Sequence, residues 1–309
     1  MFQTEFKSLH DLSAIFPDEQ SCINFLEKQR WDGAPISPFE SESKVWKCKN
    51  NRYRCKKSGK YFSVTTGTLF ENTKISLRKW FTAIWLMTSH KKGISSIQLG
   101  KDIGVTQKTA WFLAQRIRAC FCLPEETILE GVVEVDETFV GGKNKNRHKD
   151  KKVPMSQGRS FKDKTPVLGI LQRGGPLMCF VIPDTKTASI QPILKRVVRP
   201  LSTLISDEWM AYNGLNSIYD HYIVNHAKKE YVNQYDSSIH SNSIEGFWGI
   251  FKRGINGIYN WVSRKHLQFY ANEFVFRFNN RKIKESERFS LFLCNINHRL
   301  KYKHLISIS

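Results

Sequence analysis

The chain has 309 residues, 40% of them hydrophobic and 13% aromatic, which is enough for two or three domains with apolar cores and excludes wholesale disorder. Its 48 Lys and Arg against 28 Asp and Glu give a net charge of +20, which indicates a polyanionic partner, nucleic acid before an acidic membrane. The most apolar stretch, residues 80–87, is too short to span a bilayer, and the N-terminus lacks the basic start and apolar core of a signal peptide. Seven scattered cysteines without a Cys-x-x-Cys motif are typical of a reducing cytoplasm.

The first predicted domain, residues 1–72, combines short helices with a small β unit. Residues 1–30 alternate at helical spacing, and residues 31–42 form a loop rich in Pro, Gly and Ser. Residues 44–64 alternate basic with apolar or aromatic side chains, with turns predicted at Asn50-Asn51 and Ser58-Gly59. Eight of these twenty-one residues are Lys or Arg, so the β unit has a basic face that is either a solvated surface or a nucleic-acid contact.

Residues 73–124 are predicted to form a helix-turn-helix domain. A first helix is followed by two short helices. Gly104-Val105 forms the turn between the two short helices, and Thr106 caps the second of them. The second helix of such a pair is placed to enter a major groove, with Gln107, Lys108 and Thr109 facing the bases. The alternative is an ordinary helical hairpin that packs on the next domain.

Residues 130–290 are predicted to form an α/β domain. Strands are expected at 131–142, 165–175, 176–184 and 203–209, and helices at 189–202 and 242–259. A basic loop, residues 143–164, separates the first two strands; loops of this length and charge are usually either functional or disordered. The last residues, 291–309, are predicted to be a C-terminal tail.

Three acidic residues occupy informative positions in this domain. Asp136 lies on an apolar strand, Asp207 closes a second strand, and Glu245 starts an amphipathic helix. Carboxylates at strand ends and on a nearby helix can converge, and a cation must then offset their repulsion. Oxygen ligands suit Mg²⁺ or Mn²⁺, and two such ions can support phosphodiester chemistry. Glu137 and Glu208 are expected to point to the opposite faces of their strands, outside this metal site.

Several long motifs carry a resemblance. VEVDETFVGG is followed by a basic loop and then by KTPVLGI, SDEWMAY, HSNSIEGFWGIFKRGINGIY and VSRKHLQFYANEFVFRFNNR. In this order the motifs resemble the catalytic domain of bacterial insertion-sequence transposases of the Merlin-related group, insertion-sequence family fifteen-ninety-five, a branch of the DDE transposases. The upstream segment FSVTTGTLFENTKISLRKWF and its continuation to Arg118 resemble the same family, so the resemblance covers roughly residues 31–290.

The resemblance implies a ribonuclease-H-like catalytic domain with a DDE triad. Asp136 and Asp207 match its first two acids, and Glu245 matches the third, with Asn242 as a rival because some members have Asn here. Lys252 matches a lysine that accompanies the triad and is expected to hold a phosphate. Further DNA contacts are expected from Lys143, Lys145, Arg147, Lys149 and Arg253.

The sequence departs from the family at its zinc ribbon. The first Cys-x-x-Cys knuckle aligns with Ser37-Pro38-Phe39-Glu40 and the second with Cys55-Lys56-Lys57-Ser58, so three of four thiolates are missing. Cys48 is not at ligand spacing, and a tetrahedral zinc site cannot be built from Cys55 alone. No structural zinc is therefore expected. An aromatic core of Trp46, Tyr53, Tyr61 and Phe62 is expected to hold the β unit instead.

These features predict a DNA transposase that binds the terminal inverted repeats of its element, cuts the ends with metal-activated water and joins the 3′ ends to target DNA. Its expected partners are these DNAs and a second copy of itself, as a homodimer or a larger assembly on DNA; no membrane partner is expected. A bacterial protein of this kind would work in the cytoplasm, associated with the nucleoid. The alternatives are a host-adopted, sequence-specific DNA-binding protein without transposition activity and a structure-selective DNA nuclease.

Overall fold

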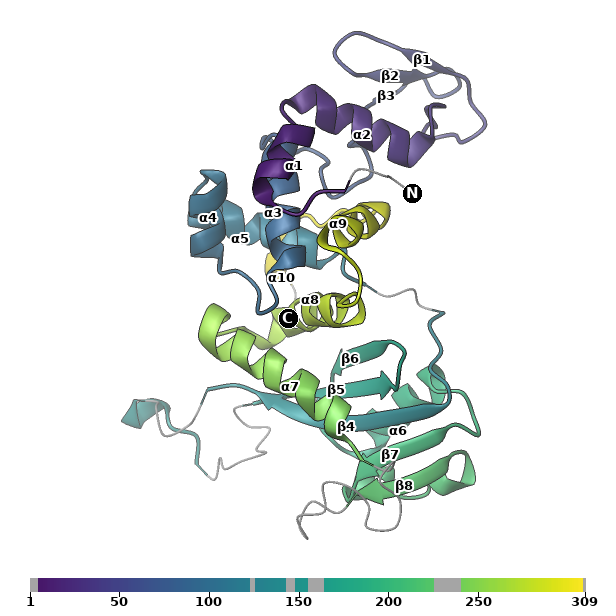
Figure 1. The fold of residues 1–309 in the computed structure, drawn as a ribbon, viewed down its shortest axis with the longest axis vertical. Coiled ribbons are helices and arrows are strands. Elements are labelled where there is room, and N and C mark those ends of the chain that lie inside the picture. Colours follow the sequence, from purple (N-terminus) through teal and green to yellow (C-terminus); the bar gives the residue numbers. More distant parts are fainter. Residues whose placement is uncertain (1–4, 123–125, 143–147, 155–163, 225–239, 308–309) are drawn as a thin grey trace. The chain divides into compact units, whose positions relative to one another are not determined.

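The structure, a computed structural model, describes residues 5–122, 126–142, 148–154, 164–224 and 240–307. The chain divides into two compact units, both drawn in Figure 1. Unit 1 contains residues 1–121 and 280–309, and unit 2 contains residues 122–279. Within the described ranges, every helix is too short or too polar to cross a lipid bilayer.

Unit 1 begins with two short helices, α1 (Leu9–Ile15) and α2 (Glu19–Trp31). A side chain caps the start of each helix. The Ser8 hydroxyl accepts a hydrogen bond from the Asp11 N–H at 3.1 Å, and the Asp18 carboxylate accepts one from the Ser21 N–H at 2.7 Å. These caps satisfy backbone donors that the first turn of a helix leaves without a partner.

The β unit is a three-stranded antiparallel sheet of β1 (Val45–Lys47), β2 (Tyr53–Cys55) and β3 (Tyr61–Phe62), in that order. Its turns lie where the sequence predicts them. Asn50 and Asn51 take φ values of 59° and 54°, and Gly59 takes 68°, the left-handed backbone that tight hairpins require.

The predicted aromatic core of this sheet is only half right. Tyr53 and Phe62 are buried, and their rings lie 5.1 and 6.0 Å from the ring of Trp31. Trp46 and Tyr61, in contrast, are 48% and 53% exposed. The strand register explains the difference, because Trp46 and Tyr61 both pair with Arg54 and share its outward face.

Three helices follow in unit 1: α3 (Leu77–Ser89), α4 (Ser96–Ile103) and α5 (Gln107–Arg118). The turn between α4 and α5 uses Gly104 in the left-handed conformation, and the Thr106 hydroxyl accepts from the Thr109 N–H at 3.3 Å. A Cβ on Gly100 would lie 3.0 Å from the Val105 carbonyl oxygen, so glycine lets α4 approach this turn closely.

The C-terminal residues complete unit 1 through α9 (Glu285–Cys294) and α10 (Tyr302–Ser307). The Phe289 ring lies 5.5 Å from the Phe81 ring, and the Leu69 N–H donates to the Ile296 carbonyl at 2.9 Å. The predicted boundary at 290/291 therefore falls inside α9, and the predicted tail carries buried side chains. The predicted domain 1–72 and all but the last three residues of the predicted domain 73–124 belong to this single unit.

Unit 2 is built on a mixed five-stranded sheet in the order β6-β5-β4-β7-β8. Its strands are β4 (Val132–Val140), β5 (Thr165–Gln172), β6 (Leu177–Val181), β7 (Thr203–Asp207) and β8 (Asp220–Val224). The strands β4, β5 and β6 pair antiparallel, whereas β4, β7 and β8 pair parallel. This arrangement confirms the predicted α/β class.

Helices cover both faces of this sheet. One face packs on α6 (Thr187–Val197) and on the 3-10 turns Met210–Tyr212 and Leu215–Ser217. The other packs on α7 (Asn242–Gly254) and α8 (Leu267–Asn279). A π-helical segment, Ile255–Tyr259, and a 3-10 turn, Arg264–His266, connect α7 to α8, and a further 3-10 turn, Lys149–Lys151, lies between β4 and β5.

Candidate active site

The parallel pairing of β4 and β7 brings Asp136 and Asp207 to one edge of the sheet. The last residue pair of the two strands is Glu134 with Ile205. Each aspartate lies two residues beyond this pair on its own strand, and ligand sites in such sheets form at the carboxyl ends of the strands. Asp136 accepts from the N–H of Glu137 at 2.8 Å, and the buried Asp207 accepts from the N–H of Trp209 at 3.1 Å.

Three carboxylates form the acidic group of this site: Asp136, Glu137 and Asp207. One oxygen of each lies within 4.8 Å of the others, the separation at which a cation could bind all three. The prediction that Glu137 stays outside the group is wrong. Pairing between β4 and β7 ends before Glu137. The Glu137 side chain starts on the face opposite to Asp136, but it can therefore reach the same carboxyl end of the paired strands. Glu208 is exposed and lies outside the group, as expected.

Tyr212 supports the acidic group from the face of the sheet that packs on α6. Its hydroxyl donates to the Glu137 carboxylate at 2.5 Å, and its ring is buried in the core beneath β4. Burial raises the pKa of Tyr212 well above its ordinary value, and the negative charges of Glu137, Asp207 and Asp136 raise it further. The tyrosine therefore remains a neutral donor, and it fixes one oxygen of Glu137.

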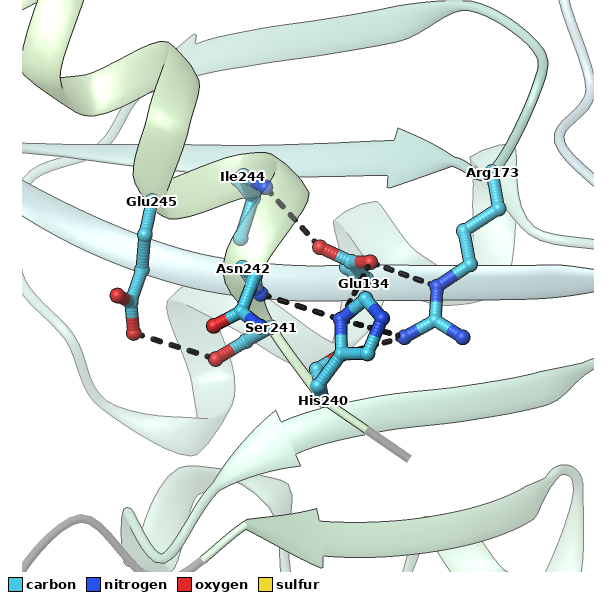
Figure 2. Close-up of polar contacts among 7 residues, drawn as sticks. All are labelled: Glu134, Arg173, His240, Ser241, Asn242, Ile244 and Glu245. Atoms are coloured by element: carbon cyan, nitrogen blue, oxygen red, sulfur yellow. Dashed lines mark hydrogen bonds and ion pairs between the residues drawn. The ribbon is translucent and has the colours of Figure 1, made fainter. Parts of the chain in front are cut away.

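Helix α7 is tied to β4 by a buried hydrogen-bond network (Figure 2). The side chain of Glu134 is fully buried; one of its oxygens accepts from the backbone N–H of Ile244 at 3.0 Å, and the other accepts from Arg173 at 2.7 Å. Arg173 also donates to the His240 carbonyl at 2.6 Å. This network fixes the first turn of α7 to the strand that carries Asp136.

Neither Glu134 nor Arg173 was predicted as part of the site from the sequence. A signal was present, because Glu134 interrupts an apolar strand between Val133 and Val135, where a charge is tolerated only with a partner.

The predicted third acid, Glu245, lies on the first turn of α7 and is half-buried. It accepts a hydrogen bond from the Ser241 hydroxyl at 3.3 Å, and Figure 2 shows its carboxylate directed away from Glu134 and Arg173. Its rival, Asn242, is exposed at the start of the same helix. Glu245 is not a member of the acidic group, whose ligand atoms come from β4 and β7 alone. Lys252 is exposed on the last turn of α7.

Gly169 sets how closely α7 approaches the sheet. It pairs with Asp136 across β4 and β5, and a Cβ at this position would lie 2.6 Å from Cζ2 of Trp248. Only glycine leaves room for the indole of Trp248 against the sheet at the register of Asp136.

The other residues predicted to contact DNA are distributed over both units. At the start of α5, the Gln107 amide donates to the Ser96 hydroxyl at 2.9 Å, and the Thr109 hydroxyl pairs with that of Thr106 at 2.9 Å. Lys108, Lys149 and Arg253 are exposed. The predicted contacts outside the described residues are Lys143, Lys145 and Arg147.

The residues at the zinc-knuckle positions do not suit a zinc ion. The Ser37 hydroxyl accepts from the N–H groups of Phe39 and Glu40 at 3.2 and 3.3 Å, and the Cys55 sulfur accepts from the Ser58 N–H at 3.5 Å. At these positions the side chains offer serine hydroxyls, whereas zinc needs thiolates or imidazoles. The hydroxyls of Ser37, Ser43 and Ser58 all form hydrogen bonds with the Cys55 sulfur. We call these four residues the serine–cysteine cluster.

Comparison with known proteins identifies the family. The family model of the ISXO2-like transposase domain matches residues 128–279, which is nearly all of unit 2. An uncharacterized transposase-like protein of Haemophilus influenzae is 30% identical over 105 residues, which cover 34% of this chain and 81% of that protein. The chain belongs to the ISXO2-like transposase family. This result confirms the resemblance to insertion-sequence transposases that the sequence motifs carry.

Other relatives of this transposase agree. An uncharacterized protein in transposable element ISH50 of Halobacterium salinarum is 29% identical over 276 residues, which cover 85% of the transposase and 91% of that protein. Among solved structures, the simian T-cell lymphotropic virus intasome in complex with PP2A regulatory subunit B56 gamma matches with a TM-score of 0.27 at 11% identity, over 61% of the transposase and 66% of that chain. A pre-cleavage Mos1 transpososome matches with a TM-score of 0.19 at 11% identity, over 94% and 97% of the two chains.

Proposed function

We propose that this transposase cuts DNA at the ends of its element and joins the freed 3′ ends to target DNA. The observation that supports this proposal best is the acidic group, because three carboxylate oxygens within 4.8 Å of one another occur at the carboxyl ends of β4 and β7. Such a concentration of negative charge is costly unless a cation offsets it.

The donor set suits Mg²⁺ or Mn²⁺, since all three ligand atoms are carboxylate oxygens, the type that these hard cations prefer. We infer that Asp136, Asp207 and Glu137 hold the ion. When bound, the metal lowers the pKa of water and stabilises the negative charge on a leaving oxygen. Tyr212 and the backbone N–H of Trp209 each hold one carboxylate in place, which keeps the ligands oriented.

Helix α7 would supply the remaining groups. We infer that Glu245 acts as the third acid when DNA is bound, with Asn242 as its rival. Lys252 lies seven residues after Glu245, on nearly the same helical face, and would contact a phosphate near the cut.

The chemistry has two displacements at phosphorus. In the first, a water oxygen bonds to the phosphorus at the end of the element, the bond from phosphorus to the 3′ oxygen breaks, and that oxygen takes up a proton. In the second, the new 3′ hydroxyl loses its proton and bonds to a target phosphorus, and a 3′ hydroxyl of the target is released. Neither step needs a covalent intermediate with the protein.

We propose that unit 1 recognises the element. Helices α4 and α5 act as a helix-turn-helix that places Gln107, Lys108 and Thr109 in the major groove of the terminal inverted repeats. The net charge of +20 supports extensive phosphate contacts. We infer that unit 2 is ribonuclease-H-like, which its mixed sheet with helices on both faces supports. Because two DNA ends must be brought together, the working form is a homodimer or a larger assembly on DNA.

The test is cleavage of a plasmid that carries the gene with its native flanks, in Mg²⁺ or Mn²⁺. Wild type, Asp136→Asn and Asp207→Asn are compared with Glu208→Gln, which alters an exposed neighbour outside the acidic group. We expect breaks at the element's ends with wild type and Glu208→Gln, and none with the two aspartate variants. Tight binding without cleavage would instead support a host-adopted DNA-binding protein. Cleavage of branched DNA regardless of the ends would support a structure-selective nuclease.

A further inference from the structure

The outward face of the small sheet in unit 1 carries a row of basic and aromatic side chains. Arg54 pairs with Trp46 on one side and with Tyr61 on the other, and Arg52 lies two residues before it on the same face. All four side chains are exposed, whereas their strand neighbours Tyr53, Cys55 and Phe62 are buried on the opposite face. We call Trp46, Arg52, Arg54 and Tyr61 the arginine–tyrosine face.

Tyr61 holds both arginines in place. The guanidinium carbons of Arg52 and Arg54 lie 5.6 and 5.7 Å from the centroid of its ring, and the Arg54 Nε–H also donates to the Gly59 carbonyl at 3.3 Å. A guanidinium contacts a ring through its flat face, while its N–H donors lie in its own plane. Contact with the Tyr61 ring restricts both guanidinium groups, and the in-plane donors of a stacked guanidinium remain available to an anion.

The charge around this face suits a polyanion. Eight Lys and Arg occur between residues 44 and 64, and no Asp or Glu occurs between Ser43 and Phe70. Holding two arginines on one aromatic ring costs conformational entropy. A surface that contacts only water offers no interaction that offsets this cost. Pre-ordered guanidinium groups are instead typical of phosphate recognition.

We propose that the arginine–tyrosine face is a phosphate clamp for duplex DNA, in which Arg52 and Arg54 bind neighbouring backbone phosphates and Tyr61 pre-orders them. The inference rests on the proposed function, because it takes DNA to be the polyanion. The clamp reads no base sequence; it fixes the position of unit 1 on the duplex while α5 reads the major groove. Tyr61 is a positioning residue here, since it acts through the two arginines.

The test is the salt dependence of binding by the full-length protein to a duplex that carries the native element end. Arg52→Ala/Arg54→Ala removes two phosphate contacts, so the slope of log K against log salt should become shallower by about 1.8. Between 50 and 200 mM salt this change corresponds to about a tenfold smaller loss of affinity than in wild type. Lys301→Ala/Lys303→Ala removes the same charge from exposed positions elsewhere in unit 1 and should leave the slope unchanged.

Two tyrosine variants separate pre-ordering from charge. Tyr61→Phe keeps the ring and should bind like wild type, whereas Tyr61→Leu should bind several-fold more weakly with both arginines still present. All of these side chains are exposed, so thermal unfolding should be unchanged and should exclude misfolding as the cause. An unchanged slope in the double arginine variant, or an equal change in the double lysine variant, would overturn the clamp.

Single-stranded DNA of the same sequence is the second probe. If the arginine and tyrosine variants weaken only single-strand binding, the face stacks unpaired bases and the duplex clamp is wrong. The plasmid-cleavage assay separates this inference from the proposed function: cleavage by wild type with an unchanged slope in the double arginine variant removes only the clamp. No duplex binding and no cleavage by wild type would remove both.

Discussion

The buried carboxylate of Glu134 accepts a hydrogen bond from the backbone N–H of Ile244 at 3.0 Å, although the two residues are 110 positions apart in the sequence. This bond joins the first half of β4 to the first turn of α7. It therefore couples the strand that presents Asp136 to the helix that presents Glu245.

Replacing Glu134 with Ala should strongly destabilise unit 2. The change leaves Arg173 and the Ile244 N–H without their buried partner, and breaking a buried pair in this way costs about 3–5 kcal/mol. Glu134→Gln keeps an oxygen acceptor and should cost less. The measurement is the free energy of unfolding in urea. The control is Glu130→Gln, which breaks an exposed pair with Arg199 and should cost less than about 1 kcal/mol. Equal losses of unfolding free energy in Glu130→Gln and Glu134→Ala would contradict the stabilising role of Glu134.

Glu245 should matter more for cleavage than Asn242. A carboxylate adds negative charge for a metal ion, whereas the neutral amide of Asn242 does not. We expect Glu245→Gln to lower the cleavage rate by about 100-fold or more, within the range seen when one charge-stabilising group is removed. Asn242→Ala should have a smaller effect, and Ser243→Ala, an exposed change on the same turn, should have none. The reverse order of the first two effects would assign the third position of the triad to Asn242.

Gly169→Ala should separate α7 from the sheet. The new methyl group would lie 2.6 Å from the indole of Trp248, so the helix or the strand has to move, at a cost of about 1–3 kcal/mol. Cleavage should fall together with the melting temperature, because Gly169 pairs with Asp136. Gly142→Ala is the control, since a Cβ there meets no atom within 4 Å. Wild-type melting of the Gly169 variant would show that the packing at this point is loose.

The serine–cysteine cluster should leave the β unit independent of zinc. Purified wild type should contain no stoichiometric zinc by metal analysis, and a chelator should not change its melting temperature. The variant Ser37→Cys/Ser43→Cys/Ser58→Cys supplies four thiols with Cys55 and should bind one zinc ion, with the single variant Ser43→Cys as its control. One zinc per wild-type chain would prove the metal-free assignment wrong.

The stability of unit 1 should depend on pH through Cys55. Burial alone would raise the pKa of this thiol, but hydrogen bonds from Ser37, Ser43 and Ser58 outweigh burial and lower it to about 6 from the ordinary 9.0. Folding then favours the thiolate, so this contribution to stability is complete above pH 9 and is lost as the pH falls towards 6. The measurement is the melting temperature of unit 1 between pH 6 and 9, which should rise with pH.

The control is Cys22→Ser, which removes another buried thiol of unit 1. Burial raises the pKa of Cys22 to about 12, so this group contributes little pH dependence between pH 6 and 9. Cys55→Ser should abolish the change of melting temperature with pH in this range, and Cys22→Ser should retain it. The same slope in both variants would mean that Cys55 remains a neutral thiol in the folded protein.

Local patterns predicted most of the elements and two of the three carboxylates of the acidic group. Alternation predicted β4, β5, β6 and β7 but not β8, and the positions of Asp136 and Asp207 followed from their strands. Glu137 was misjudged because alternation states which face a side chain follows, whereas its reach depends on where pairing with the neighbouring strand stops. Glu134 was missed because its partners, Arg173 and Ile244, come from distant segments that no local period connects.

The same limit explains the errors in unit 1. Trp46 and Tyr61 were placed in a core because aromatic side chains are usually buried, and only the register with Arg54 shows that they face outward. The prediction of a C-terminal tail fails because partners of these residues lie more than 200 positions earlier, as with Ile296 and Leu69.

Unit 1 is assembled from both ends of the chain, and this has a consequence for synthesis. Residues 1–121 leave the ribosome before unit 2, yet Phe81 and the Leu69 N–H obtain their partners only from residues 280–309. At ordinary elongation rates the interval is roughly ten to thirty seconds. Unit 2 is contiguous and can fold during that time. A product that terminates shortly after residue 279 would therefore contain a complete unit 2 but an unfinished unit 1, so only full-length chains would have both units closed.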